Sequence, residues 1–209
     1  MAAQTPENVW DYPRPPALEK TPLRLRIVWT DEEGQESVLA DTMSGYRVLE
    51  TSHPPTYYIP PKDVNTEWLT KSPRSSFCEV SLYPPSWAEG LVFYNHHAEL
   101  HFRLLPPDRK WKGQATYYNL QPTTSSRPLV KDRIWTYSNP TPRFVIIKDY
   151  LSFYATSSSS NSRSEGGKGQ WKCFVGEEEV VPQEGDFYGG WKTSWIQGKM
   201  KGGPGTWGW

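Results

Sequence analysis

The sequence lacks the features that mark several common classes of protein. Its 209 residues include only two cysteines, Cys78 and Cys173, too few for a disulfide framework and without the paired Cys-x-x-Cys spacing of a zinc site. Its 23 basic and 23 acidic residues balance, so the basic excess of a nucleic-acid-binding protein is missing. No apolar run approaches the ~20 residues of a membrane-spanning helix, and the first residues do not resemble a signal peptide. We therefore expect a soluble, cytoplasmic, single-domain protein with no nucleic-acid and no membrane partner.

Fingerprints of cofactor chemistry are missing as well. The chain has no Gly-x-Ser-x-Gly nucleophile elbow, no dinucleotide-binding fingerprint, no glycine-rich phosphate loop and no closely spaced acidic pair for Mg²⁺. His96, His97 and His101, together with Glu99, imitate a metal site, but they lie in a segment that is doubtful for a reason given below. We expect no cofactor and no metal.

Aromatic residues are abundant instead. Eleven Trp, twelve Tyr and seven Phe stand beside twenty Pro and sixteen Gly, whereas only 36% of the residues are hydrophobic. Such a chain builds its core from a few large rings, each of which buries ~150–250 Å². Residues 23–29 alternate apolar and polar with a period of two, a charged turn follows at 31–34, and 37–40 return as a second strand. This pattern predicts a β-hairpin.

The fold class predicted from these patterns is mainly β, a single twisted sheet or open barrel with one packed helix near 142–153. The helix is predicted to begin after Thr141-Pro142, and its apolar stripe consists of Phe144, Ile147, Tyr150 and Leu151. A Pro-rich aromatic arm (1–22), a flexible Ser/Gly loop (156–170) and a Gly/Trp-rich tail (183–209) complete the single domain. The tail is expected to wrap the surface with its rings as anchors.

A string of motifs runs through the middle of the chain: Leu-Glu-Thr and His-Pro-Pro over residues 49–55, an aromatic pair at 57–58, Cys78, Lys-Gly at 112–113, Ala-x-Tyr at 115–117 and Trp-x-Tyr at 135–137. This string resembles the signature of the domain-of-unknown-function family numbered 427, and the arm and tail resemble its fungal branch. The resemblance implies a compact, mostly β domain with one helix. Some catalogues give the family a nucleotidyltransferase-like name, which no motif of this sequence supports.

One departure from the family pattern concerns residues 80–110. The family continues from its Cys to Lys-Gly within one or two residues, and removing 80–110 restores that order here. Val80-Ser81 can be encoded as GTAAGT, the consensus start of an intron, and Lys110 as AAG, which ends in AG. We hypothesise that the segment is a translated intron; a genuine lid or hairpin insert is the alternative. The three histidines of the apparent metal site all lie inside it.

Four residues of the motifs are candidates for catalysis. Glu50 and His53 can act as an acid–base pair, or they can hold backbone donors and shape a turn. Lys112 can face an anionic substrate or lie in solvent. Cys78 becomes a nucleophile if a cation such as Lys112 lowers its pKa, and is otherwise a small buried hydrophobe.

Four rings are candidates for the walls of a ligand pocket, and each can equally belong to the core: Tyr57, Tyr118, Trp135 and Tyr137. The leading hypothesis is a protein that acts on or binds a small molecule, with cofactor-free proton transfer or isomerisation as the chemistry. A non-catalytic interaction protein that uses tail anchors such as Trp191 is the alternative, and nucleotidyl transfer rests on the family name alone. Whether the protein is an enzyme, and its oligomeric state, cannot be read from the sequence.

Overall fold

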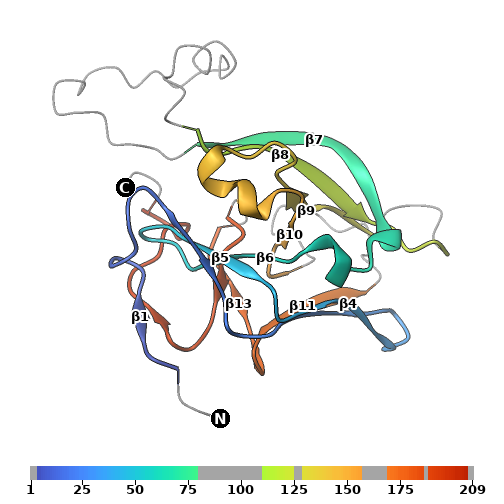
Figure 1. Cartoon of the computed structure of the whole chain (residues 1–209). Coiled ribbons are helices and arrows are strands. Elements are labelled where there is room, and N and C mark those ends of the chain that lie inside the picture. Colours follow the sequence, from blue (N-terminus) through green and yellow to red (C-terminus); the bar gives the residue numbers. More distant parts are fainter. Residues whose placement is uncertain (1–3, 80–109, 125–128, 157–168, 186–187, 207–209) are drawn as a thin grey trace.

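The computed structural model describes residues 4–79, 110–124, 129–156, 169–185 and 188–206, without the side chains of residues 77–79 and 110–111. Strands predominate in these ranges, as the sequence predicts for a mainly β fold. In Figure 1 strands β7, β8 and β9 lie on one side of the molecule and β4 and β11 on the other, with β5 and β6 between them.

The first four-stranded sheet contains the predicted hairpin. Its order is β12 (Glu178–Glu179), β11 (Gln170–Val175), β3 (Leu25–Thr30) and β4 (Glu36–Thr42). Along β3 the burial alternates, so Leu25, Ile27 and Trp29 face the core while the residues between them are half-buried. The period-two pattern therefore located both the strand and its inner face, and the hairpin is confirmed.

The second four-stranded sheet has the order β10 (Leu151–Phe153), β9 (Val130–Thr136), β8 (Lys110–Leu120) and β7 (Leu69–Glu79). A three-stranded sheet, β2 (Ala17–Lys20), β5 (Tyr46–Leu49) and β6 (Thr56–Tyr58), joins it through a bridge between Ile59 and Leu151. Neighbouring residues of β8 point to opposite faces, so Tyr117 belongs to one buried cluster while Tyr118 packs against the other. The sheet thus separates two hydrophobic cores.

The predicted helix near 142–153 is shorter than expected and of a different type. A 3₁₀ helix, η4, spans Pro142–Ile147, and the chain then enters strand β10 at Leu151. Phe144 and Ile147 are buried, and their spacing of three fits the three residues per turn of a 3₁₀ helix. Asp149 has φ 62° and so leaves the helical region before the strand begins. Among the described residues, two shorter 3₁₀ helices are η1 (Pro61–Asp63) and η2 (Thr66–Trp68).

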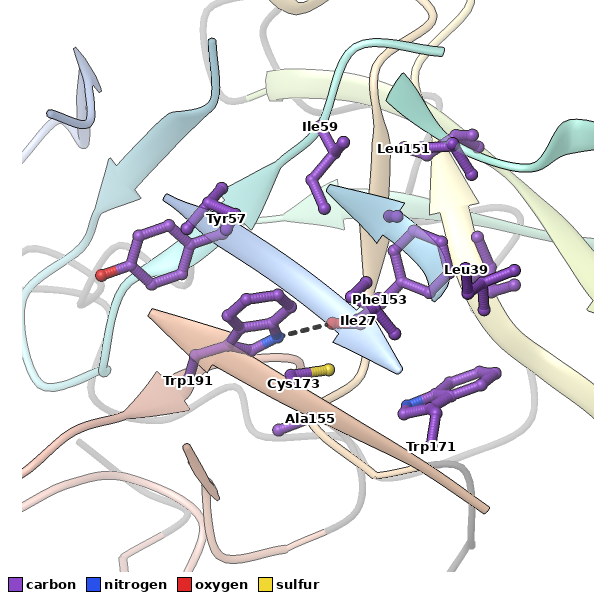
Figure 2. Close-up of a cluster of buried hydrophobic side chains, with 14 of the residues drawn as sticks. Ile27, Leu39, Tyr57, Ile59, Leu151, Phe153, Ala155, Trp171, Cys173 and Trp191 are labelled. Atoms are coloured by element: carbon purple, nitrogen blue, oxygen red, sulfur yellow. Dashed lines mark hydrogen bonds between the residues drawn. The ribbon is translucent and has the colours of Figure 1, made fainter. Parts of the chain in front are cut away.

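The tail does more than wrap the surface. Its strand β14 (Trp191–Lys192) pairs with β13 (Val181–Pro182), and β15 (Ile196–Gln197) pairs in parallel with β1 (Glu7–Asn8) of the arm. Trp191 has no exposed surface, and its Nε1 donates to the Phe153 carbonyl at 2.8 Å. Figure 2 shows this indole among the core residues, beside Tyr57 and Cys173.

Burial raises the pKa of the Cys173 thiol and keeps it protonated.

Within the described ranges no helix is long and apolar enough to cross a membrane.

The proposed insert enters and leaves the fold at one place. β7 and β8 pair antiparallel, with Phe77 opposite Gln114 and, after an irregularity, Glu79 opposite Lys110. Without residues 80–110, Phe77 and Gln114 would be joined by the five residues Cys78, Glu79, Trp111, Lys112 and Gly113. Five residues are an ordinary length for a hairpin loop. The ends of the segment are therefore compatible with its removal.

Deleting residues 80–110 is expected to leave the fold intact and to raise the free energy of unfolding by about 1–2 kcal/mol, because a shorter loop costs less entropy to close. Urea unfolding followed by circular dichroism measures the change against the full chain. A deletion variant that no longer folds would identify the segment as a structural part of the domain.

Candidate functional site

His53 lies in the turn that follows β5, where the sequence reads Glu-Thr-Ser-His-Pro-Pro. Its backbone N–H donates to the Glu50 carbonyl at 3.0 Å, and Ser52 before it adopts φ 67°. The His53 Nδ1 lies 3.0 Å from the Thr51 carbonyl. A carbonyl only accepts, so Nδ1 carries the proton in the neutral ring and Nε2 is left as the basic nitrogen. The turn therefore sets which nitrogen of His53 can accept a proton.

Burial is the main reason why the His53 ring is neutral near pH 7. Burial lowers the pKa of His53, and the ammonium groups of Lys201 and Lys112 lower it further. The Glu50 carboxylate and the Thr51 carbonyl act in the opposite direction without cancelling the effect. A neutral imidazole is the form that serves as a general base.

Lys112 reaches this group from β8, about sixty residues along the chain. It is only 7% exposed, and its carbonyl accepts from the Thr141 N–H at 3.3 Å. Gly113 follows with φ +107°, and a Cβ there would lie 3.0 Å from the Asn139 carbonyl oxygen. Glycine is required at this position, which gives the Lys-Gly motif a structural reason.

The tail supplies two neighbours that the sequence did not identify. The Tyr188 ring packs edge-on against His53, with 4.7 Å between ring centroids. Burial raises the pKa of Tyr188, and the Glu50 carboxylate adds to the rise, so its hydroxyl stays protonated. Lys201 is held beside the turn by a hydrogen bond from its backbone N–H to the Ser52 carbonyl, 2.9 Å long.

Two glycines let the tail approach this closely. A Cβ at Gly189 would lie 2.1 Å from the Trp135 ring, and one at Gly190 would lie 2.9 Å from the Pro54 carbonyl oxygen. Neither contact has room for a side chain. The Gly-Gly pair after Tyr188 is the feature of the sequence from which this close approach of the tail could have been predicted.

The structure brings some of the candidate residues together and separates others. The charges of Glu50 and Lys112 both act on the His53 ring, and the Trp135 ring lies against Gly189, next to Tyr188. Tyr57 lies elsewhere, in the core beside Trp191, as Figure 2 shows. The remaining candidates are distributed as follows: Tyr137 is buried in the same cluster as Trp135, Tyr118 packs against the other cluster, and the Cys78 side chain lies outside the described residues.

Tyr57 and Tyr118 therefore do not share a pocket wall with Trp135 and Tyr137. The reason is the alternation of side chains, which sends neighbouring strand residues to opposite faces. Within the ranges that the structure describes, no three His, Cys, Asp or Glu side chains gather where they could hold a metal ion. The three histidines of the apparent metal site, at 96, 97 and 101, lie outside these ranges.

Comparison with known proteins adds one match. A family model described as a domain of unknown function (DUF427) matches residues 17–81 and 107–163. The match contains Glu50, His53 and Lys112, and it contains neither residues 82–106 nor the tail. No curated protein matches the chain.

Proposed function

The chain belongs to the DUF427 family. From this premise we propose that it acts on a small molecule by cofactor-free proton transfer, with His53 as the residue that moves the proton. The observation that carries the proposal is the turn that leaves Nε2 as the basic nitrogen of His53, and the charges of Glu50 and Lys112 that act on that ring support it. These residues come from two distant parts of the chain, and they combine a neutral imidazole with a carboxylate and a buried ammonium. Such a set has the elements of general acid–base chemistry.

The proposed step assigns a role to each residue. His53 Nε2 removes a proton from a carbon next to a carbonyl group, the C–H bond breaks, and its electron pair moves onto the carbonyl oxygen as an enolate. The ammonium of Lys112 stabilises that negative charge, and Glu50 stabilises the imidazolium while it exists. His53 then returns the proton to the same carbon, which restores the carbonyl compound with its hydrogen exchanged. In an α-hydroxy carbonyl compound the proton can instead return to the former carbonyl carbon while the α-hydroxyl proton passes to the former carbonyl oxygen, so that the α-hydroxyl becomes the new carbonyl. This second outcome is an isomerisation, and neither outcome needs an oxidant or co-reactant.

Two rings are proposed to flank the substrate. The Tyr188 ring packs edge-on against His53, and the Trp135 ring lies against Gly189, the residue after Tyr188. Aromatic side chains limit the access of water, which strengthens the electrostatic interactions of a site. In this proposal the aromatic lining of the pocket comes partly from the tail.

The experiment is deuterium exchange. The protein is incubated in D₂O with a panel of ketones, lactones and oxo-acids, and loss of the C–H signal is followed by proton NMR. His53→Asn is the informative variant because its amide can still donate to Thr51, which preserves the turn, while the basic nitrogen is lost. We expect exchange with at least one compound to fall by about 100-fold or more.

The pH dependence has a defined sign. His53 acts as a base only when it is neutral, and its pKa lies below the ordinary value. The rate should therefore hold from pH 7 down past pH ~6.5 and fall only at lower pH. Absence of exchange across the panel, or an unchanged rate in the folded His53→Asn protein, contradicts the proposal.

The alternative of a non-catalytic interaction protein is weakened, because Trp191, one of its expected partner anchors, is not exposed. Trp191 lies wholly in the core, so its ring is not free for a partner, whereas Trp195 is half-buried and packs against the same core. Trp207 and Trp209 lie outside the described residues. Nucleotidyl transfer has only the family's catalogue name in its favour, and calorimetric titration with nucleotides and Mg²⁺ tests it.

A further inference from the structure

The sheet β12-β11-β3-β4 has a second face, which is turned away from the core. Because Leu25, Ile27 and Trp29 of β3 point inward, Arg26 and Val28 between them point to this outer face. Both are half-buried. In Figure 1 β4 and β11 lie on the side of the molecule away from β7, β8 and β9.

Strand pairing arranges the side chains of the outer face in rows. Arg26 lies opposite Asp41 of β4 on one side and opposite Phe174 of β11 on the other. In the next row Val28 lies opposite Val38, which is 56% exposed. The Arg26 guanidinium lies over the Phe174 ring, with 4.8 Å between Cζ and the ring centroid. The outer face thus presents one oriented cation beside two aliphatic side chains.

The carboxylates in the row of Arg26 are bound by other cations. Asp41 accepts from the guanidinium of Arg24, with 2.7 Å between Oδ1 and Nε. Glu179 of β12, at the far end of the row, pairs with the Lys172 ammonium at 3.1 Å. Within the described ranges of the chain, no hydrogen bond or ion pair engages the Arg26 guanidinium, and its Nε is buried without a partner. Arg26 is therefore the cation of this face that lacks an anion.

A guanidinium in this state is prepared for a carboxylate. The Phe174 ring restricts its orientation, so less conformational entropy is lost when it binds. Its buried Nε is withdrawn from water, and a charged group withdrawn from water is stabilised by an opposite charge. The planar carboxylate matches the fork of N–H donors at the end of an arginine side chain. The acceptor that the outer face does not itself supply to Arg26 is thus a carboxylate.

We propose that the outer face binds an extended segment of another protein, which carries an Asp or Glu side chain and an aliphatic side chain two positions away. Arg26 receives the carboxylate, and Val28 and Val38 contact the aliphatic side chain. Alternate residues of an extended segment lie on one side, roughly 6.6 Å apart, which is also the spacing of Arg26 and Val28 along β3. The exposed Val38 favours a protein segment over an inorganic anion, because only the segment buries apolar surface. This binding does not depend on the chemistry proposed for His53.

The test selects binders from a library of random ten-residue peptides displayed on phage, with the full chain as the target. The selection is repeated on the Arg26→Gln protein, and peptides recovered only with the unsubstituted chain are sequenced. We expect these peptides to contain an Asp or Glu with a Val, Ile or Leu two positions before or after it. The recovered peptides are then synthesised, and calorimetric titration measures their dissociation constants.

Three protein variants and one change in the peptide measure the contribution of the cation. Arg26→Gln should weaken peptide binding by roughly tenfold, the loss expected for one hydrogen bond to a charged group. Replacing the acidic residue of the peptide by its amide should cost the same factor. Phe174→Leu stays apolar but removes the ring under the guanidinium, so binding should weaken about threefold. Arg143→Gln is the matched control, because Arg143 is an exposed arginine of η4, and it should change nothing. Circular dichroism verifies that each variant is folded.

Several outcomes would overturn the proposal. One is that no recovered peptide distinguishes the two proteins, or that the peptides which do so lack an acidic residue. Another is that inorganic phosphate displaces the peptide at concentrations near the peptide's own dissociation constant, which would indicate a site for small anions. A third is a dimer of the free chain that Arg26→Gln dissociates, observed by analytical ultracentrifugation, which would assign the outer face to a second copy of this chain.

Discussion

Replacing Trp191 by alanine is expected to lower the free energy of unfolding by about 3–5 kcal/mol, the usual cost of removing a large buried side chain. The indole is completely buried, stacks at a tilt against Tyr57 with 5.2 Å between ring centroids, and donates to the Phe153 carbonyl (Figure 2). The backbone N–H of Trp191 also donates to the Pro55 carbonyl at 2.8 Å. The substitution therefore leaves a cavity in the core and removes contacts that hold the tail near His53. Urea unfolding measured by circular dichroism gives the change.

Two further variants keep this prediction testable if Trp191→Ala does not fold. Trp191→Phe retains most of the ring but loses the hydrogen bond, and it should cost about 1–3 kcal/mol because the Phe153 carbonyl is left without that donor. Trp10→Ala removes a ring that is 46% exposed, so its effect should be the smallest of the three. A loss below about 1 kcal/mol for Trp191→Ala, smaller than the usual cost of a core truncation, contradicts the assignment of the tail to the core.

Replacing Arg47 by methionine should be the second large effect, about 2–3 kcal/mol, somewhat below the ~3–5 kcal/mol typical of a fully buried pair. Arg47 donates to both carboxylate oxygens of Glu7 at 2.8 and 3.0 Å, and to Glu19 at 3.0 Å. Tyr12 donates to the same Glu7 carboxylate at 2.9 Å. Removing the guanidinium leaves Glu7 half-buried without its cation and detaches the arm from β5.

The matched control is Arg24→Met. Arg24 also pairs with a carboxylate, that of Asp41, but the guanidinium is solvent-exposed, so the change should be barely measurable. Equal losses in the two variants would mean that burial does not distinguish the pairs. Chemical unfolding at low and at high salt adds a second criterion, because salt screens the exposed pair more strongly than the half-buried one.

Local patterns in the sequence predicted the secondary structure correctly where buried side chains recur with a regular period along the chain. The alternation over 23–29 located β3 and its buried face. A packed helix begins at Pro142 as predicted, but it is a 3₁₀ helix that ends at Ile147, because the spacing of Phe144 and Ile147 fits three residues per turn as well as 3.6. The continuation to Tyr150 and Leu151 looked helical, but Leu151 pairs with Thr136 in a sheet. Strand pairing is a tertiary contact, and it overrode the pattern.

The candidate site was only partly readable for the same reason. Glu50 and His53 stand three residues apart, so one turn brings them together and the motif could be recognised locally. Lys112 was identified as a candidate, but nothing in the sequence says that β8 would bring it to that turn. Tyr188 and Lys201 were missed, since a contact between residues more than a hundred positions apart leaves no period in the sequence.

The sequence by itself determined the mainly β class, the first hairpin and the family, and it supplied the candidate residues for the proposed acid–base chemistry. These depend on composition, side-chain alternation and short motifs, which are properties of neighbouring residues. Only the tertiary structure decided that Trp191 belongs to the core, that Tyr57 and Tyr118 lie apart from Trp135 and Tyr137, and that the tail reaches His53. Those outcomes depend on which sheet faces pack together, and packing is settled by burial and close approach between distant segments.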